Sequence, residues 1–404
     1  MDIKHLVENY PKLQQYISEI HYSDMYIKQI NQAFSFIVQN NKGYWNDYFD
    51  VEKEFCNSKK ENTNNSRRVA LSVIANFDCF EIYPNGSRQN YFKINLPLIQ
   101  PFQEFLEYVE KMAEKNGLAD SYNMNCISIL KSFMVYLQDK GIKSFQEVHP
   151  EDVISFFSNG KEPMKSYDSV MRLRHALETG MNWNEAIRKI YIDIPIIRNR
   201  RKNIQYLTPE EIAALLEALE DETTGLSLCA RTIGYLLYYT GLRACDITRM
   251  KIGNIDWDKE KIMLVQHKTG IPVTLPLPVK AGNMIFRYLT EERPECDCDF
   301  LFIRSNAPYK PYNPTSITNI CSKIFKTAGI RQNPGERQGS HIFRHNVVKK
   351  LLENGVSKPV ITAMIGHSNP SSIDAYVNTD FIHLKECALS VERFPMGPEA
   401  FRYE

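Results

Sequence analysis

The stretch HIFRHNVVKKLLENGVSKPVITAMIGHSNPSSIDAYVN, residues 341–378, decides how the functional half of this chain folds. It holds three histidines, one arginine and one tyrosine, although the whole chain has only nine histidines. Residues three apart share a helix face, so His341 and Arg344 are expected to project together. Gly355 and Gly366 are predicted to end two short helices. These short helices and tight turns predict that four polar side chains meet: His341, Arg344, His367 and Tyr376.

Tyrosine is a poor nucleophile at neutral pH because its ordinary pKa is about 10. It becomes useful where a base removes its proton and cations stabilise the anionic centre that it attacks. A phosphodiester is such a centre, since its non-bridging oxygens match the fork of a guanidinium. The stretch TGLRACDI (240–247) supplies a second arginine, Arg243, with Asp246 placed to hold it. Lys268, at the tip of a predicted hairpin, would protonate the leaving oxygen as a general acid.

Together these segments resemble the tyrosine recombinases, also called the phage integrase family. The family's order is an arginine, a hairpin lysine, the motif H-x-x-R, a histidine in a Gly-His turn and then the tyrosine. This chain shows that order as Arg243, Lys268, His341, Arg344, His367 and Tyr376. The resemblance covers roughly residues 97–395 and is strongest over 240–249, 264–277 and 341–378.

The resemblance implies a role for each member of this set. Tyr376 would attack a DNA phosphate, forming a 3′-phosphotyrosine and freeing a 5′ hydroxyl. Arg243 and Arg344 would bind the non-bridging oxygens, and His367 would donate another hydrogen bond. His341 would be the base and Lys268 the acid. No ATP, cofactor or metal is expected, because the covalent intermediate keeps the energy of the phosphoester bond.

The expected fold is mainly α with a small antiparallel β-sheet. Short strands are expected within 253–258, 261–266, 271–277 and 300–304. The expected parts are an N-terminal segment (1–95), a helical core-binding, SAM-like domain (97–192), a basic linker (193–206), a catalytic domain (207–395) and a tail (396–404). The first part would be an arm-type DNA-binding or accessory module, with a loop at 57–68 and a hairpin at 78–94 that turns at Asn85-Gly86. The apolar stripe at 381–394 would dock on a neighbouring protomer or on its own domain.

Double-stranded DNA is the expected partner, although the net charge is only +1, because binding depends on where charge gathers. The candidate DNA-binding residues are Arg172, Arg174, Arg198, Arg200, Arg201, Lys202, Lys323 and Lys326. The family resemblance implies a homo-tetramer on paired DNA sites, a monomer or weak oligomer away from DNA, and accessory DNA-bending proteins. No apolar run is long enough to cross a bilayer, and no secretory signal opens the chain, so a cytoplasmic protein is expected.

Integration or excision of a mobile element is the favoured function, and three alternatives stay open. One is a type IB topoisomerase-like enzyme, which would use similar chemistry on a single duplex. Another is a helix-turn-helix regulator, since residues 347–369 fit that motif and a regulator needs no nucleophile. The third is a metallo-hydrolase on His341 and His345, although no glutamate follows the first histidine. His345 is otherwise expected to pack inside the fold, and no metal site is expected at Cys296 and Cys298.

Overall fold

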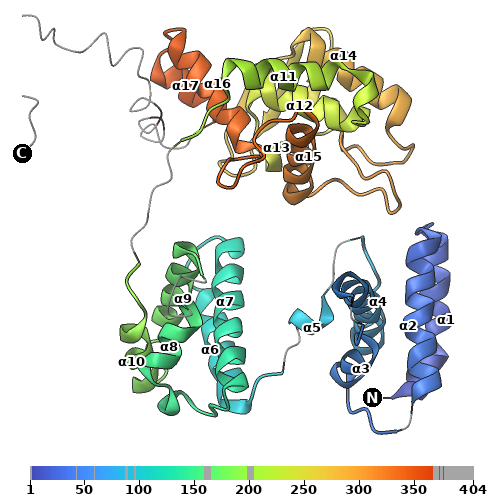
Figure 1. Ribbon diagram of the computed structural model, residues 1–404, viewed down its shortest axis with the longest axis vertical. Helices are drawn as coiled ribbons and strands as arrows, with labels where there is room; N and C mark the ends of the chain where they lie inside the picture. Colours follow the sequence, from blue (N-terminus) through green and yellow to red (C-terminus); the bar gives the residue numbers. More distant parts are fainter. Residues whose placement is uncertain are drawn as a thin grey trace, which may run out of the picture. The chain divides into compact units, whose positions relative to one another are not determined.

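The protein is mainly helical in the computed structural model (Figure 1), which describes residues 2–41, 43–58, 60–86, 90–94, 97–158, 165–197, 204–366, 373 and 376. The chain divides into two compact units. The first comprises Met1–Ile3, Ala33–Ile82 and Arg88–Lys202, and the second comprises Lys4–Gln32, Tyr83–Ser87 and Asn203–Glu404. Within the described residues, no helix is both long and apolar enough to span a membrane.

In its described residues, the beginning of the chain consists of helices and their connections. Its helices are α1 (Ile3–Glu19), α2 (Asp24–Asn40), α3 (Tyr48–Phe55), α4 (Glu61–Phe80) and α5 (Tyr91–Ile94). The predicted hairpin at 78–94 is wrong, because its first residues are the last turn of α4 and its last residues form α5. Much of the predicted loop at 57–68 is wrong for a related reason. Its polar residues from Glu61 onward form the first turns of α4, whose buried part begins at Ala70.

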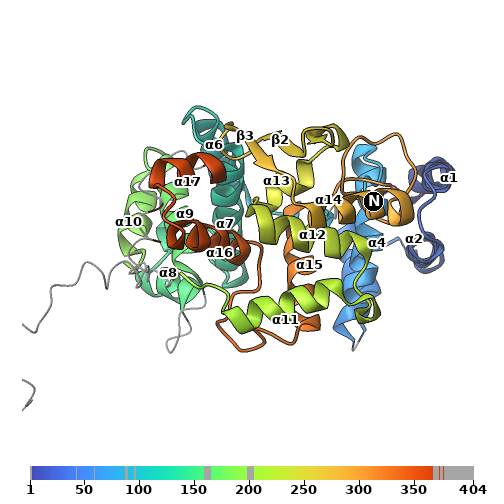
Figure 2. The same ribbon diagram turned by 90° about the horizontal axis from the view of Figure 1, so that it is seen from above.

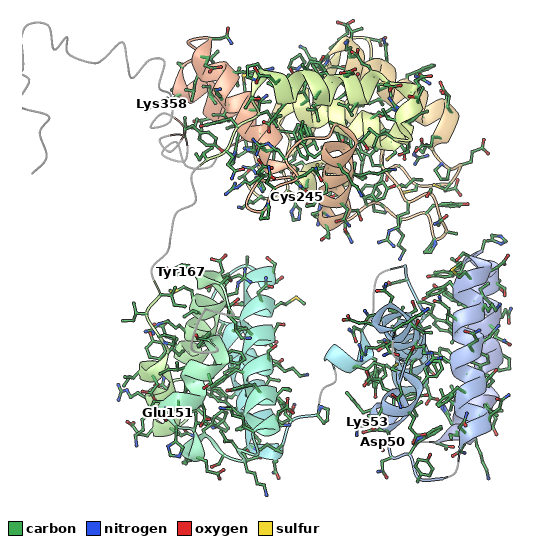
Figure 3. The ribbon with its side chains drawn as sticks, viewed as in Figure 1. Asp50, Lys53, Glu151, Tyr167, Cys245 and Lys358 are labelled. Atoms are coloured by element: carbon green, nitrogen blue, oxygen red, sulfur yellow. The ribbon has the colours of Figure 1, made fainter. Side chains whose placement is uncertain are left out.

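Within the first unit, residues 97–158 and 165–197 form a helical bundle. It contains α6 (Gln100–Ala113), α7 (Asp120–Asp139), the 3₁₀ turn η1 (Phe145–Glu147), α8 (Pro150–Phe157), α9 (Tyr167–Thr179) and α10 (Glu185–Asp193). Aromatic rings dominate its core: Phe105 and Phe133 are fully buried, and Phe102 packs 4.7 Å from Phe145 between ring centroids. Charged side chains such as Glu151 cover the outside of the bundle (Figure 3).

The second unit is built around α12 (Leu228–Thr240), which is buried along most of its length. Against it pack α11 (Pro209–Glu220), α14 (Val279–Arg287), α15 (Pro314–Thr327) and α16 (His341–Glu353), seen from above in Figure 2. Two further helices pack on these: α13 (Ala244–Arg249) on α15 and α17 (Lys358–Ile365) on α16. Short turns occupy η2 (Glu222–Thr224), η3 (Ile252–Asn254) and η4 (Tyr288–Glu292). Thr208 opens α11 with the predicted capping box, and Gly241 ends α12 at a φ of 63°.

The sheet of the second unit has three antiparallel strands in the order β1-β2-β3. They are β1 (Ile255–Asp256), β2 (Lys261–Val265) and β3 (Pro272–Pro276). Ile262 and Leu264 of β2 point inward opposite Leu275 and Val273 of β3. The strand predicted at 300–304 is wrong: this segment makes only single bridges, from Phe300 to Lys251 and from Ile303 to Pro311.

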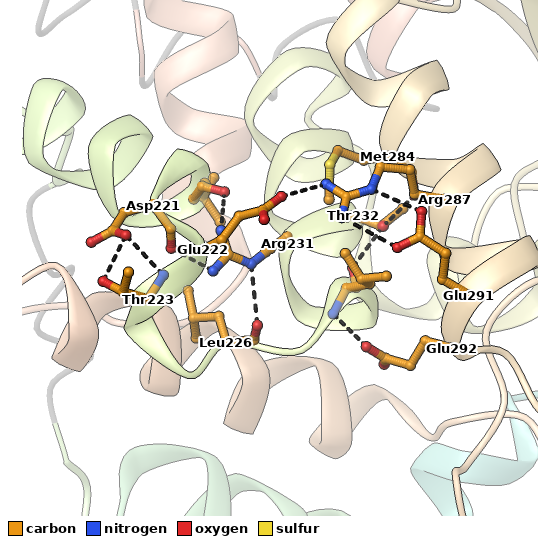
Figure 4. Close-up of polar contacts among 12 residues, drawn as sticks. Asp221, Glu222, Thr223, Leu226, Arg231, Thr232, Met284, Arg287, Glu291 and Glu292 are labelled. Carbon is orange, nitrogen blue, oxygen red and sulfur yellow. Dashed lines mark hydrogen bonds and ion pairs between the residues drawn. The ribbon is translucent and has the colours of Figure 1, made fainter.

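A buried arginine fixes the turn between α11 and α12 (Figure 4). Arg231 donates to the carbonyl oxygens of Leu226 at 3.1 Å, Leu219 at 2.6 Å and Asp221 at 2.5 Å. These carbonyls lie at the end of a helix and in a turn, where the backbone itself offers few donors. Nearby on the surface, Arg287 pairs with two carboxylates. The network holds the N-terminal end of α12 in place, and the other end of α12 carries the candidate site.

Candidate active site

Arg344 lies at the centre of the candidate site and is almost fully buried in α16. Its two terminal nitrogens donate to backbone oxygens that end helices: Nη1 to Gly241 at 3.1 Å and Nη2 to Ile365 at 2.5 Å. Burial, followed by the positive charge of Arg243, lowers the pKa of Arg344 to about 10. The side chain is thereby fixed between the ends of α12 and α17 and remains cationic at neutral pH.

Arg243 reaches the same place from a different element. It occupies the N-cap position of α13, two residues after the left-handed Gly241. Its Nη2 donates to the carbonyl of Gly366 at 3.2 Å, and its Nη1 donates to Oε1 of Gln266. Asp246 takes a different partner from the one predicted, since its Oδ1 accepts a hydrogen bond from the backbone N–H of His267 at 2.9 Å.

Gln266 is a site residue that the sequence analysis missed. Its side chain is fully buried, and Nε2 donates to the carbonyl of Ile365 at 3.0 Å while Oε1 accepts from Arg243. Gly366 has a φ of 62°, and a Cβ at this position would collide with the Gln266 amide. One signal was available: Gln266 continues the inward alternation of Ile262 and Leu264 along β2, so a polar side chain was due to point into the core.

Lys268 lies at the exposed tip of the turn between β2 and β3, as predicted. The hydrogen bond from His267 to Asp246 anchors this turn against α13. Lys268 lies close enough to His341 for its charge to lower the pKa of that histidine. The hairpin lysine and the first residue of α16 therefore lie within electrostatic range of each other.

His341 begins α16 and keeps contact with solvent. The surrounding protein nevertheless lowers its pKa, first through desolvation and then through the charges of Arg344, Arg337 and Lys268. A histidine with a lowered pKa is neutral at physiological pH and can accept a proton. Arg337, which was not predicted as a site residue, has no carboxylate partner among the described residues.

Tyr376 is 8% exposed and belongs to an apolar cluster with Val348, Ile361, Ile365 and Ile373. Its ring meets that of His345 edge-on, with 5.4 Å between centroids. Burial raises the pKa of Tyr376, and the positive charge of Arg344 works in the opposite direction. The structure thus brings Tyr376 within electrostatic range of Arg344. His367 lies outside the described residues.

The candidate DNA-binding residues fall into three groups. Arg174 is engaged within the first unit, where its guanidinium lies 4.4 Å from the centroid of the Tyr191 ring and donates to the carbonyl of Ile194. Arg172 is half-buried on α9, whereas Lys323 and Lys326 are exposed on α15. Lys323 donates to the carbonyl of Gly225 at 3.2 Å. The remaining candidates lie outside the described residues: Arg198, Arg200, Arg201 and Lys202.

The geometry at the centre of the site is that of an anion-binding site. Two guanidiniums approach each other closely enough for Arg243 to depress the pKa of Arg344. In the described part of the chain, neither forms an ion pair with a carboxylate. Their present partners are neutral oxygens, which neutralise no charge. A phosphate would meet both arginines, with Lys268 and His341 beside it.

Comparison with known proteins covers the region that contains the site. A family model for the "Phage integrase family" matches residues 205–383. A protein of Sinorhizobium fredii with the provisional name integrase/recombinase y4gC is 32% identical over 185 residues, which are 46% of this chain and 94% of that protein. The tyrosine recombinase XerA of Pyrococcus furiosus is 30% identical over 188 residues, 46% of this chain and 60% of XerA. Among solved structures, a lambda integrase dimer bound to a COC′ core site has the same fold, with a TM-score of 0.53 and 16% identity over 77% of this chain and 86% of that one.

Proposed function

This chain belongs to the phage integrase family of tyrosine recombinases, which are site-specific recombinases, and from that premise we propose that it cuts and rejoins DNA through a 3′-phosphotyrosine formed on Tyr376. The observation that carries the proposal is the pair of guanidiniums, Arg243 and Arg344, which face the same helix end without a carboxylate partner in the described chain. Such a pair fits the two non-bridging oxygens of a phosphodiester.

In this mechanism the Tyr376 hydroxyl attacks the phosphorus as His341 takes its proton. The bond from phosphorus to the 5′ oxygen breaks, and Lys268 supplies the proton to that leaving oxygen. Arg243 and Arg344 stabilise the charge that builds up on the phosphate, and His367 donates a further hydrogen bond. Attack by a 5′ hydroxyl on the phosphotyrosine reverses the steps. The strand is therefore rejoined without nucleotide hydrolysis, cofactor or metal.

The biological setting follows as a second part of the proposal. Double-stranded DNA is the substrate, and four protomers act on two paired sites, with accessory DNA-bending proteins, in the cytoplasm. Residues 97–192 form the core-binding domain, 193–206 the linker and 207–395 the catalytic domain. The N-terminal segment, 1–95, favours integration or excision of a mobile element, because it offers an additional surface for arm-type sites. The name integrase among the relatives supports this choice.

The experiment is covalent capture. Wild-type protein and Tyr376→Phe are incubated in EDTA with fragmented host DNA and with nicked duplexes that trap the intermediate. After denaturation, the protein-linked DNA is isolated and its attached ends are sequenced. A 3′-linked adduct with wild type alone is the expected result, and its sequence gives the target site.

Adducts with both proteins would move the nucleophile to another residue. Sequence-specific retention of DNA without any adduct would favour the helix-turn-helix regulator. A second assay, with two differently labelled duplexes that carry the recovered site, separates the enzyme classes. Exchange of label between the duplexes is expected of a recombinase, whereas nicking and closing of one duplex alone would favour the topoisomerase-like enzyme.

A further inference from the structure

The residues that lead into the catalytic domain, 204–206, are bound to the loop that precedes α16. The side-chain amide of Gln205 both donates and accepts hydrogen bonds. Its Nε2 donates to the carbonyl of Gly335 at 2.9 Å, and its Oε1 accepts from the backbone N–H of Arg337 and from Nη1 of Arg331, both at 2.9 Å. One half-buried glutamine is thus held by three partners in a loop more than a hundred residues further along the chain.

The backbone of Gln205 extends this connection to the candidate nucleophile. Its carbonyl lies 3.2 Å from Nδ1 of His345. A carbonyl oxygen can only accept, so Nδ1 of His345 carries the proton and the tautomer is fixed. The ring of His345 then meets Tyr376 at an interplanar angle of 80°, one of the preferred aromatic geometries. A continuous set of contacts therefore runs from Gln205 through His345 to the Tyr376 ring.

The flanking residues reinforce this arrangement. Ile204 and Tyr206 pack against the apolar cluster that contains Tyr376. Arg331 holds Tyr206 in place, since its Nη2 donates to the carbonyl of Tyr206 and its Nε lies 3.1 Å from the carboxylate of Glu211. The apolar cluster itself gives Tyr376 little orientation, because hydrophobic contact is not directional. Among the described residues, the hydrogen-bonded His345 gives the Tyr376 ring a directional contact.

We infer that Gln205 and His345 are positioning residues for the reaction, which orient the Tyr376 ring toward the phosphate held by the two arginines. The inference rests on the proposed function and adds two residues to it. Neither residue touches the reacting atoms. Gln205 fixes the rotamer and tautomer of His345, and His345 fixes the ring of the nucleophile. The physical need is clear, because a misplacement of about 1 Å can cost on the order of 100-fold in rate.

The test compares Gln205→Ala, His345→Ala and the double variant with wild type. Gln332→Ala is the matched control, because Gln332 lies on the same loop and makes a local hydrogen bond to the carbonyl of Ile330. Single-turnover adduct formation is measured at saturating protein on an end-labelled nicked duplex that carries the site recovered by covalent capture. The dissociation constant of the same duplex is measured with each change placed in a Tyr376→Phe background, where no chemistry occurs. Thermal melting of each variant identifies those that are folded.

We expect each single variant to react about 10- to 100-fold more slowly at saturation, with affinity for the duplex unchanged within about twofold. The double variant should be no slower than His345→Ala, because the two residues act in series. Gln332→Ala should match wild type. If His345→Ala melts below the assay temperature, the rate of Gln205→Ala is compared with that of Gln332→Ala alone.

Three results would overturn the inference: variants that react at the wild-type rate, variants that lose only affinity, or effects that add in the double variant. A wild-type protein that forms no adduct overturns the proposed function itself, and it does so before any variant is compared. The two failures are therefore distinguishable.

Discussion

The packing of Gly366 against Gln266 leads to a quantitative prediction for Gly366→Ala. Gly366 has a φ of 62°, which costs a residue with a Cβ about 1–2 kcal/mol. The added Cβ would also collide with the side-chain amide of Gln266, which is fully buried, and moving this amide aside would break its hydrogen bonds with Arg243 and the carbonyl of Ile365. Overpacking of this kind costs about 1–3 kcal/mol. Gly366→Ala should therefore reduce the free energy of unfolding by roughly 2–5 kcal/mol.

The chain offers a matched control at Gly355, which has a φ of 70° but has no atom within 4 Å of an added Cβ. Gly355→Ala should thus cost only the backbone part, about 1–2 kcal/mol. In a Gln266→Ala background the collision is removed, so Gly366→Ala should cost about the same as Gly355→Ala. The difference between the two backgrounds is a coupling energy of about 1–3 kcal/mol.

The measurement is urea unfolding of the four proteins of this cycle, followed by the fluorescence of Trp257. The other two tryptophans, Trp45 and Trp183, are replaced by phenylalanine in all four, so that the signal reports the second unit. Equal m-values would show that the same surface is exposed in each transition. An identical cost of Gly366→Ala with and without the Gln266 side chain would refute the reasoning, because it would leave no role for the collision.

Four further predictions follow from individual charges. Arg337→Gln should raise the pKa of His341 toward its ordinary value, so the acidic limb of the cleavage rate should move to higher pH in a profile of single-turnover rates. Burial lowers the pKa of His345 to about 4. At a pH between this value and 6.5, the histidine is therefore protonated in the unfolded chain and neutral in the folded chain. The associated stability is present above pH 6.5 and is lost as the pH falls toward 4, by up to about 3 kcal/mol, and His345→Gln should remove this acid sensitivity in urea titrations. Arg231→Leu should destabilise the second unit by about 3 kcal/mol or more, since it removes the hydrogen bonds to two buried carbonyls and one partly buried carbonyl, and calorimetry would measure the loss. Lys268→Ala should slow cleavage about 10²- to 10⁴-fold on ordinary DNA, whereas a duplex with sulfur at the leaving 5′ position, which needs no acid, should restore the rate.

Local signals in the sequence were sufficient for much of the fold. The capping box at Thr208, the glycine that ends α12 and the alternation of β2 and β3 each depend on neighbours within a few residues. The Asn85-Gly86 dipeptide is an equally local signal, and it failed because the flanking residues join helices α4 and α5 instead of pairing with each other. Local patterns report what a segment can form, whereas packing decides which form it takes.

The same distinction between local patterns and distant packing applies to the site residues. Arg344 and His341 could be predicted because one helix carries both. The inward direction of Gln266 follows from the alternation of β2, but the partners of Gln266 and Gln205 could not be predicted, since they lie 99 and 130 residues away. A buried amide that pairs with distant carbonyls has no sequence signature of its own. The parts of the site that hold the charged groups in place were therefore the parts that only the structure could reveal.

The contacts of Gln205 also determine where this chain can be divided for protein engineering. Residues 193–206 would ordinarily be treated as an exchangeable connector, and a chimera would be joined anywhere within them. Ile204, Gln205 and Tyr206 nevertheless pack and bond as part of the second unit. A junction placed after Tyr206 would import three foreign residues into the surroundings of Tyr376, whereas one placed before Ile204 would leave them intact. The working boundary for exchanging the part of the chain before the second unit therefore lies before Ile204, three residues earlier than the predicted start of the catalytic domain at 207.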